Sequence, residues 1–466
     1  MKGKRLVCLL ATALSLLSGC VHYHPKPISA PAAADTFDER TLNDERLRHF
    51  FEANHETAQW PRKTWDLNGL TLAAFYYHPD LDVARAKWSG ARAARITAGE
   101  RPNPSVSLTP TYDTTTTPPW ILGLSFDIPV ETAGKRGHRI QQARHLSEAA
   151  RRNLAATAWK VRSRVRGRLL DLYAARETVA ALKQQEAAQT KLVELLERQV
   201  EAGAISSFES TQARVGLNTT RLALQEAQRQ NAEAGAQLAD AIGVPGSALG
   251  NITLSFDGLN QFPTELTTAE ARRQAAVNRT DILAALAEYA ASQAALQLEI
   301  ARQYPDLHIA TGYQLDQRDN KWTLGATLTL PVLNQNQGAI AEAKAHREEA
   351  AARFVSVQAK ALGEIDRAVA GYGAARQQVA TAGSLLADLR KRQDTSKAMF
   401  EAGEVDALAL ANAQVEFSTG TLAQVSSLMK AQQALAALED AVQSPLTMAG
   451  ETKLWENSPK RLATEK

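Results

Sequence analysis

The chain has 466 residues, with 53 Lys and Arg against 50 Asp and Glu, so its formal net charge is only +3. That balance excludes a protein whose main task is to neutralise many phosphates of a nucleic acid. Hydrophobic residues make up 44% of the chain and aromatic residues only 6%, an alanine-rich composition typical of long, closely packed helices.

Residues 1–19 are predicted to be a signal peptide. Three of the first five residues are basic, and the apolar run from Leu6 to Leu17 is too short to cross a bilayer. The stretch "LSGC" ending at Cys20 resembles a bacterial lipobox, which implies cleavage before Cys20 and acylation of its thiol. By resemblance to the sorting rule, Val21 favours the outer membrane; an ordinary signal peptide with a chance cysteine is the alternative. Cys8 would leave with the signal peptide, so the mature chain has neither a disulfide nor a thiolate metal site.

Most of the remaining chain repeats one pattern at an offset that stays within 200–202 residues. A constant offset needs almost no gaps, so it predicts a tandem duplication. The matching pairs include Pro104 and Pro305, Tyr112 and Tyr313, Gly203 and Gly403, and Pro245 and Pro445.

This repeat sets the predicted boundaries. They are a signal peptide at 1–19, an N-terminal anchor and linker at 20–65, a first repeat at 66–245, a connector at 246–266, a second repeat at 267–445 and a C-terminal tail at 446–466. Each repeat is predicted to hold strands, at about 103–130 and 305–332, and a helical hairpin, at about 132–243 and 334–440.

The strands are predicted from strict alternation of polar and apolar residues. In "PSVSLTPTY" and "WILGLSFDIPV" the apolar side chains fall on one face and Ser, Thr, Gly and Asp on the other, and residues 307–315 and 322–330 repeat this pattern. "DTTTTPP" and "DQRDNK" are predicted to be the hairpin loops.

Each predicted hairpin begins with an unusually long helical stretch, at 132–201 and 334–401. Glu-Ala-Gly then interrupts both, so Gly203 and Gly403 are predicted to end these helices. The returning helix of the first repeat carries Phe208, Val215 and Leu222 seven residues apart, which predicts a coiled-coil seam.

Four strands per chain pose a physical problem if their apolar faces meet lipid. Every strand edge must then be paired, and known single-chain barrels have at least about eight strands. The chain must therefore oligomerise or bury its strands elsewhere; a sheet packed on helices in a soluble protein is the alternative. After the signal peptide no run of 18 apolar residues occurs, so a membrane-spanning helix is not predicted. The aromatic residues near the hairpin loops suit an aromatic girdle at the membrane surface; they are Tyr112, Trp120, Tyr313 and Trp322.

Together these features resemble the TolC-type outer membrane factor family, over nearly all of the mature chain. The resemblance implies an α+β membrane protein, a homotrimer whose four strands per chain close one twelve-stranded β-barrel. A long α-helical coiled-coil tunnel would continue that barrel through the periplasm. "ETAGKRGHR" and "LPVLNQNQGAIAEAKA" are similar to the cobalt-zinc-cadmium resistance branch, the CzcC-like proteins.

The resemblance further implies a passive exit duct of a tripartite RND efflux system that exports divalent heavy-metal cations. Its partners would be a periplasmic adaptor (membrane fusion protein), an inner-membrane RND pump and outer membrane lipid. The location would be the outer membrane of a Gram-negative bacterium, with a lipid anchor and an extension into the periplasm. Two alternatives stay open: a duct for organic drugs, and a coiled-coil periplasmic lipoprotein that is not a channel.

The paired stretches "EAGAISS" and "EAGEVDA" are similar to the periplasmic tips of that family, where adaptor hairpins dock. This implies docking at Gly203, Ala204, Gly403 and Glu404, although both glycines could serve only to end helices. Three copies each of Glu404 and Asp406 could form an acidic collar at the mouth that favours cations. A helix N-cap at Asp406 and an ordinary surface Glu404 are the alternatives.

The chain shows no motif for catalysis, a cofactor or a resident metal. It lacks H-E-x-x-H, C-x-x-C, G-x-S-x-G and P-loop patterns, so an enzyme is not predicted. The basic stretch "VRSRVRGR" places Arg162, Arg164, Arg166 and Arg168 around a helix. Pairing with neighbouring helices, lining of a lumen and a solvated surface are all compatible with it.

Overall fold

The computed structural model describes residues 22–54, 60–250, 252–257, 259, 262–263 and 266–446. The predicted signal peptide, the lipidation site Cys20 and nearly all of the predicted tail lie outside the described residues. The chain divides into two compact units, Met1–Thr41 and Leu42–Lys466. In the first unit, the exposed helix α2 spans Ala30–Asp38 and starts with a proline in its first turn, where a missing N–H costs nothing.

The second unit begins with short elements that build a compact core. These are α3 (Glu45–Ala53), β1 (Thr64–Trp65) and α4 (Leu67–Tyr77), and β1 pairs in parallel with β4 (Thr253–Leu254). The aspartates before α3 and α4 each accept a backbone N–H of the first turn, so both helix starts are capped. The core also takes in residues of the long helices; its largest buried side chains include Phe50, Phe51, Trp65, Phe75, Trp159 and Leu169.

A separate antiparallel sheet has the strand order β2–β3–β5–β6. The strands are β2 (Ser105–Tyr112), β3 (Trp120–Val130), β5 (Leu307–Asp316) and β6 (Asp319–Leu328). Because the register keeps residues of like polarity opposite each other, one face of the sheet is apolar and the other polar. The expectation that "DQRDNK" is a loop was wrong for most of its residues: Asp316 and Asp319 pair directly, and Lys321 binds Asp316 at 2.5 Å across the strands.

Long helices connect to this sheet. The first half of the unit holds α5 (Pro79–Gly99), α6 (Lys135–Glu201), α7 (Ser207–Ile242) and the 3₁₀ turn η1 (Gly246–Leu249). The second half holds α8 (Thr268–Asn278), α9 (Thr280–Ala301), α10 (Gln337–Glu401) and α11 (Ala407–Val442).

The long helices α6 and α10 start three residues later than the helical runs in the sequence suggest. Gly134 and Asn336 precede them with φ of 71° and 63°, a left-handed conformation that cannot continue a right-handed helix. Asn336 also donates its side-chain N–H to the Glu299 carbonyl at 2.8 Å, which fixes this start against α9.

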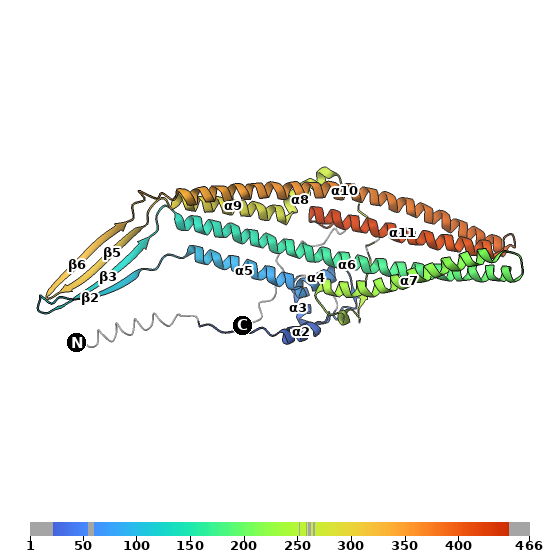
Figure 1. Cartoon of the computed structure of the whole chain (residues 1–466), viewed down its shortest axis with the longest axis horizontal. Coiled ribbons are helices and arrows are strands. Elements are labelled where there is room, and N and C mark those ends of the chain that lie inside the picture. Colours follow the sequence, from blue (N-terminus) through green and yellow to red (C-terminus); the bar gives the residue numbers. More distant parts are fainter. Residues whose placement is uncertain are drawn as a thin grey trace. The chain divides into compact units, whose positions relative to one another are not determined.

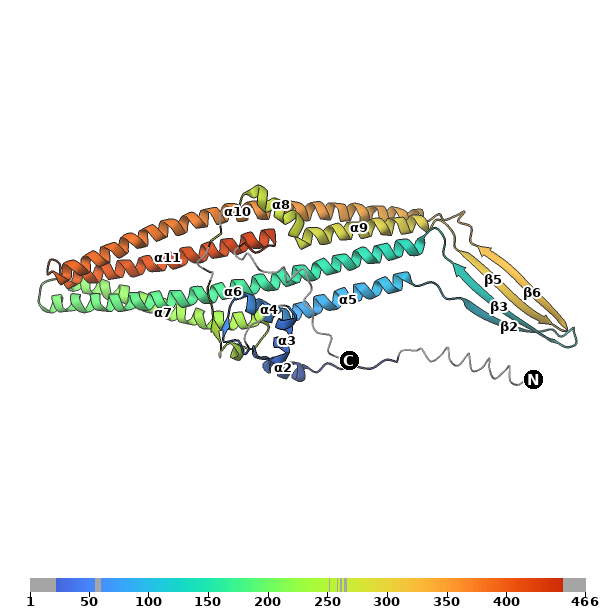
Figure 2. The same ribbon diagram turned by 180° about the vertical axis from the view of Figure 1, so that it is seen from behind.

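The helices keep the order of the strands from which they continue (Figure 1). On the sheet side the neighbours run α5, α6, α9, α10, and on the tip side they run α7, α6, α11, α10. Figure 2 shows the same order from behind. Across the residues that the structure describes, no helix has both the length and the apolar character needed to cross a membrane.

A buried charge network joins α6 to α11. Glu439 is fully buried and binds Arg162 at 3.3 Å and Arg166, whose side chains are also buried. Beside it, the Asp440 carboxylate accepts the Trp159 indole N–H at 2.8 Å, and burial raises the pKa of Asp440 above its ordinary value. Two arginines of the basic stretch therefore pair with a neighbouring helix, one of the options left open by the sequence.

Candidate functional site

The first candidate site is the turn between α6 and α7. Beyond Glu201, Gly203 has φ of 70°, the left-handed conformation that ends many helices. The Gly203 N–H donates to the Val200 carbonyl at 2.9 Å, and the Ala204 N–H donates to the Gln199 carbonyl at 2.8 Å. A Cβ at Gly203 would meet no atom within 4 Å, so the backbone conformation, and not crowding, favours glycine here.

The turn between α10 and α11 repeats this geometry. Gly403 has φ of 76°, and its N–H donates to the Phe400 carbonyl at 3.0 Å. The Glu404 N–H donates to the Met399 carbonyl at 2.8 Å. Both glycines that the sequence places at a helix end therefore end a helix.

The two turns differ in how the next helix begins. Asp406 accepts the Ala409 N–H at 2.8 Å and so caps α11, whereas Ser206 makes no such side-chain bond to α7. Glu404 and Asp406 are both exposed. Capping of α11 therefore explains Asp406 without an acidic collar. Its carboxylate is nevertheless exposed, so capping does not exclude a collar.

Both turns lie at the same end of the second unit, opposite the sheet (Figures 1 and 2). The hairpins α6/α7 and α10/α11 are held together there because α6 contacts α11. The structure thus places Gly203 and Ala204 at the same end of the unit as Gly403 and Glu404, although the two turns are 200 residues apart in the sequence. A partner that approached this end would meet two similar glycine turns.

The four predicted girdle residues form two cross-strand pairs on the apolar face of the sheet. Tyr112 lies opposite Trp120, with ring centroids 5.0 Å apart, and Tyr313 lies opposite Trp322, with centroids 4.8 Å apart. Aromatic pairs of this kind stabilise neighbouring strands. Trp322 nevertheless remains 79% exposed, so this pairing leaves a large apolar surface uncovered.

The polar face of the sheet consists mainly of small, uncharged side chains. Towards the loops it carries Asp316, Asp319 and Lys321; towards the helices it carries Asp127 on β3 and His308 on β5. The His308 Nδ1 lies 2.9 Å from the Asp127 carboxylate. The sequence alternation puts both on the polar face, but only the register of β3 with β5 brings them together.

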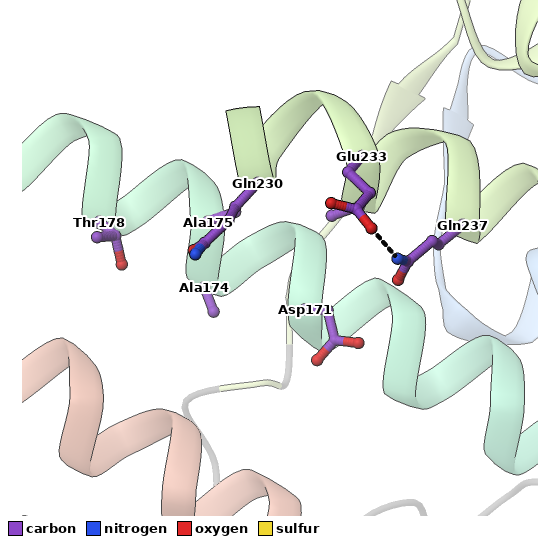
Figure 3. Close-up of a pocket in the computed structure, with 8 residues that line it drawn as sticks. Asp171, Ala174, Ala175, Thr178, Gln230, Glu233 and Gln237 are labelled. Atoms are coloured by element: carbon purple, nitrogen blue, oxygen red, sulfur yellow. Dashed lines mark hydrogen bonds between the residues drawn. The ribbon is translucent and has the colours of Figure 1, made fainter. Parts of the chain in front are cut away.

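A shallow groove between α6 and α7 is lined by five polar side chains and three alanines (Figure 3). Figure 3 shows Gln237 donating to the Glu233 carboxylate, at 3.0 Å. The Glu233 carboxylate also accepts from Arg229 at 2.7 Å, and the Asp171 carboxylate accepts from Arg168 at 3.1 Å. Because these carboxylates already have cationic partners, the groove is a helix–helix seam and we assign it no ligand.

The chain matches known proteins along most of its length. The model of the family described as "Outer membrane efflux protein" matches residues 74–244 and 271–442. The cobalt-zinc-cadmium resistance protein CzcC of Cupriavidus metallidurans is 29% identical over 238 residues. That match covers 50% of this chain and 56% of CzcC, so it spans only about half of the relative's length.

Solved outer membrane proteins share the fold. VceC of Vibrio cholerae superposes with a TM-score of 0.67 at 20% identity, over 82% of this chain and 96% of VceC. The MtrE outer membrane channel of Neisseria gonorrhoeae gives a TM-score of 0.67 at 15% identity, over 93% of this chain and 100% of MtrE. With the family model matching well over half of its residues, the chain belongs to the outer membrane efflux protein family.

Proposed function

We propose that this protein is the homotrimeric exit duct of a tripartite RND efflux system that exports divalent cations of the cobalt, zinc and cadmium type. The main supporting observation is that the sheet and the layer of helices each have two uncovered edges, and that these edges lie on the same two sides of the chain. Every residue of β2 and of β6, the outer strands of the sheet, is exposed. On the same two sides, α5 and α7 lie at one border of the helices and α10 at the other.

Three copies would close these edges. An exposed row of backbone N–H and C=O groups is a template for pairing with another chain, and in lipid such an edge must be paired. Contacts between unlike surfaces form a ring when the rotation closes. Three four-stranded sheets would supply twelve strands, within the range of known transmembrane barrels. The polar face, rich in Ser, Thr and Gly, would then line a wide aqueous lumen, and the apolar face with its aromatic pairs would meet the lipid.

The proposal includes four further assignments: the tandem repeats, the lipid anchor, the adaptor-docking turns and the acidic collar. The regions 66–245 and 267–445 would be tandem repeats, and the two segments matched by the family model support this. Cys20 would carry the lipid anchor in the outer membrane. The glycine turns at Gly203–Ala204 and Gly403–Glu404 would receive a periplasmic adaptor that links the duct to an inner-membrane RND pump, with Glu404 and Asp406 as an acidic collar at the mouth.

The metal cargo is supported by the similarity to CzcC, and a tolerance profile tests it. Deletion of the gene is expected to sensitise the cells to zinc, cobalt or cadmium, and a plasmid copy is expected to restore tolerance. Sensitivity to dyes or detergents with unchanged metal tolerance would contradict the metal cargo and favour a duct for organic drugs.

The trimer can be tested separately from its cargo. Outer membrane fractions are expected to yield an SDS-resistant species of three chains that heating dissociates. The matched variant Cys20→Ser removes the proposed lipidation and leaves every described residue unchanged. A trimer that persists in this variant supports the barrel, whereas a monomer released into the periplasm would favour a non-channel lipoprotein.

The docking role of the turns needs a substitution that preserves the fold. At Gly203 there is open space for a side chain, but the φ of 70° strains any side chain placed there, so Gly203→Ala, which carries this strain without the bulk, serves as the control for Gly203→Trp. We expect Gly203→Trp to abolish efflux with trimers intact, and Gly203→Ala to retain both. Loss of trimers in the Trp variant would instead leave the glycine with a structural role alone.

A further inference from the structure

We propose that His308, oriented by Asp127, is a transit site for a divalent transition-metal ion on the polar face of the sheet. The inference rests on the proposed function, since it assumes that metal cargo passes along this face. It concerns the end of the sheet next to the helices, where β5 begins at Leu307. A cation leaving the helical region would meet this pair first on entering the strands.

The hydrogen bond fixes which ring nitrogen of His308 is free. A carboxylate only accepts hydrogen bonds, so Nδ1 of His308 carries the proton that it shares with Asp127 over 2.9 Å. In the neutral ring, Nε2 then holds the lone pair. Histidines that ligate metals typically donate their other N–H to a carboxylate or carbonyl in this way, which fixes the ring and makes the ligating nitrogen more basic.

The surroundings leave this nitrogen accessible. The His308 side chain is 42% exposed and that of Asp127 39% exposed. Their cross-strand neighbours on the same face are small: Ala310 lies opposite Asp127, and Thr327 lies opposite His308 on β6. The nearby Asp306 carboxylate is held by Lys135 at 2.7 Å and by the Thr132 N–H at 2.9 Å, so it does not compete for the His308 ring.

The ligand chemistry selects the class of ion and sets a low affinity. Imidazole nitrogen suits Zn²⁺, Co²⁺ and Ni²⁺, whereas Mg²⁺ and Ca²⁺ prefer oxygen. Among the described residues, no group of three or more His, Cys, Asp and Glu side chains could hold a metal ion, so the site offers one ligating nitrogen, Nε2 of His308, and water completes the shell. Conduction requires binding that is strong enough to admit an ion and weak enough to release it.

Site-resolved protection of His308 tests this with the intact protein. The purified protein in detergent is labelled with diethylpyrocarbonate, which modifies unprotonated imidazole nitrogen, and each histidine is quantified by mass spectrometry. Zn²⁺ is expected to protect His308, while the same concentration of Mg²⁺ does not. His145 on α6, for which the described structure records no carboxylate partner, is the internal reference and should label equally throughout.

Variants then test the role of the carboxylate. Asp127→Ala is expected to raise the Zn²⁺ concentration for half-protection of His308 by roughly 10-fold to 100-fold, the usual effect of losing such a partner. Gln314→Ala, on the same face of β5, is the matched control and should leave it unchanged. Equal labelling of His308 with and without millimolar Zn²⁺, or equal protection by Mg²⁺, would overturn the site.

The outcomes separate this site from the proposed function. Unprotected His308 together with a metal-sensitive deletion strain would remove the transit site and leave the metal duct standing. Protected His308 together with unchanged metal tolerance of the deletion strain would overturn the transit role and the metal cargo alike, and would reduce the pair to an adventitious zinc ligand. A metal-sensitive deletion strain with Zn²⁺-specific protection supports both.

Discussion

The hairpins α6/α7 and α10/α11 have nearly equal helix lengths and matching glycine turns, yet they are buried very differently. Buried positions recur along α6 from Ala143 to Leu196, whereas α10 buries Ala343, Ala361, Ile365 and Tyr372. Within the described chain α6 contacts α4, α5, α7, α9 and α11, while α10 contacts α8, α9 and α11. Similar helices thus differ because one has neighbours on both sides and the other lies at a border.

Each hairpin therefore has an uncovered border within one chain, at α10 in the second and at α7 in the first. The exposed apolar residues of α10 include Val355 and Leu385, and those of α7 include Val215 and Leu222. Apolar helix faces of this kind call for a partner, and in the proposed trimer the α10 border of one chain would meet the α5/α7 border of the next.

Among the substitutions considered, breaking the buried charge network between α6 and α11 should lower the stability of the fold most, because this network joins the two hairpins. In Glu439→Ala, Arg162 and Arg166 would lose their buried carboxylate partner, at a cost of about 3–5 kcal/mol in the free energy of unfolding. Thermal unfolding followed by circular dichroism measures this. Asp366→Ala breaks the exposed Arg272–Asp366 pair and should cost less than about 1 kcal/mol; equal losses would contradict the importance of burial.

The glycine that ends α7, Gly243, is packed more closely than the glycines of the two turns. Gly243 has φ of 86°, and a Cβ there would lie 3.1 Å from the Tyr77 carbonyl oxygen. Gly243→Ala is therefore expected to cost about 2–4 kcal/mol, since backbone strain and a close contact combine. Gly203→Ala has only the strain and should cost about 1–2 kcal/mol. Chemical denaturation of both variants compares them, and similar losses would mean that the contact relaxes.

In the second hairpin the residue that corresponds to Gly243 is Gln443. Its backbone is also in the left-handed conformation, with φ of 49°. Its side-chain oxygen accepts the Thr280 N–H at 2.8 Å and the Thr280 hydroxyl at 2.9 Å, so it caps the start of α9. Gln443→Ala is expected to destabilise the protein by about 1 kcal/mol, the usual value of such a cap. Gln443→Asn, with a shorter side chain of the same chemistry, measures how much reach matters; an unchanged melting temperature in the Ala variant would exclude the capping role.

The smallest expected effect is a pH dependence of stability that arises at His78, at the junction between α4 and α5. His78 is buried, and its Nε2 lies 3.0 Å from Arg164. Burial lowers the pKa of His78 below its ordinary 6.5; Asp80 opposes this, Arg164 adds to it, and Asp240 opposes it. A lowered pKa means that the folded protein favours the neutral ring. The contribution of His78 to the stability of the fold is therefore complete above pH 6.5 and is lost as the pH falls below that value.

The junction between α8 and α9 supplies the control for this prediction. At the corresponding junction Arg279, with a permanent charge, binds Asp281 at 2.6 Å and Glu364 at 2.8 Å. Melting temperatures at pH 7.5 and 5.5 should differ less in His78→Gln than in the unaltered protein, while Arg279→Gln should lower both values about equally. A His78→Gln variant with the full pH dependence would contradict the role of His78.

Much of this architecture could be read from local patterns. The period-two alternation indicated the strands and their two faces, and the glycines at 203 and 403 indicated the ends of the long helices, because both signals come from backbone geometry within a few residues. The four aromatic residues singled out beside the loops form cross-strand pairs, and their role as a girdle at the membrane surface stays a prediction. The docking and collar roles stay predictions, since they depend on partners that a single chain does not contain.

Local sequence patterns were enough to predict the strands with their two faces and the glycines that end the long helices, and resemblance indicated the family. Three features emerge only in the folded chain: Glu439 pairs with Arg162 and Arg166, Asp127 meets His308, and α6 is central while α10 lies at a border. The reason is physical: periodicity reports which face of an element is apolar, whereas partners more than a hundred residues apart are chosen by packing and register.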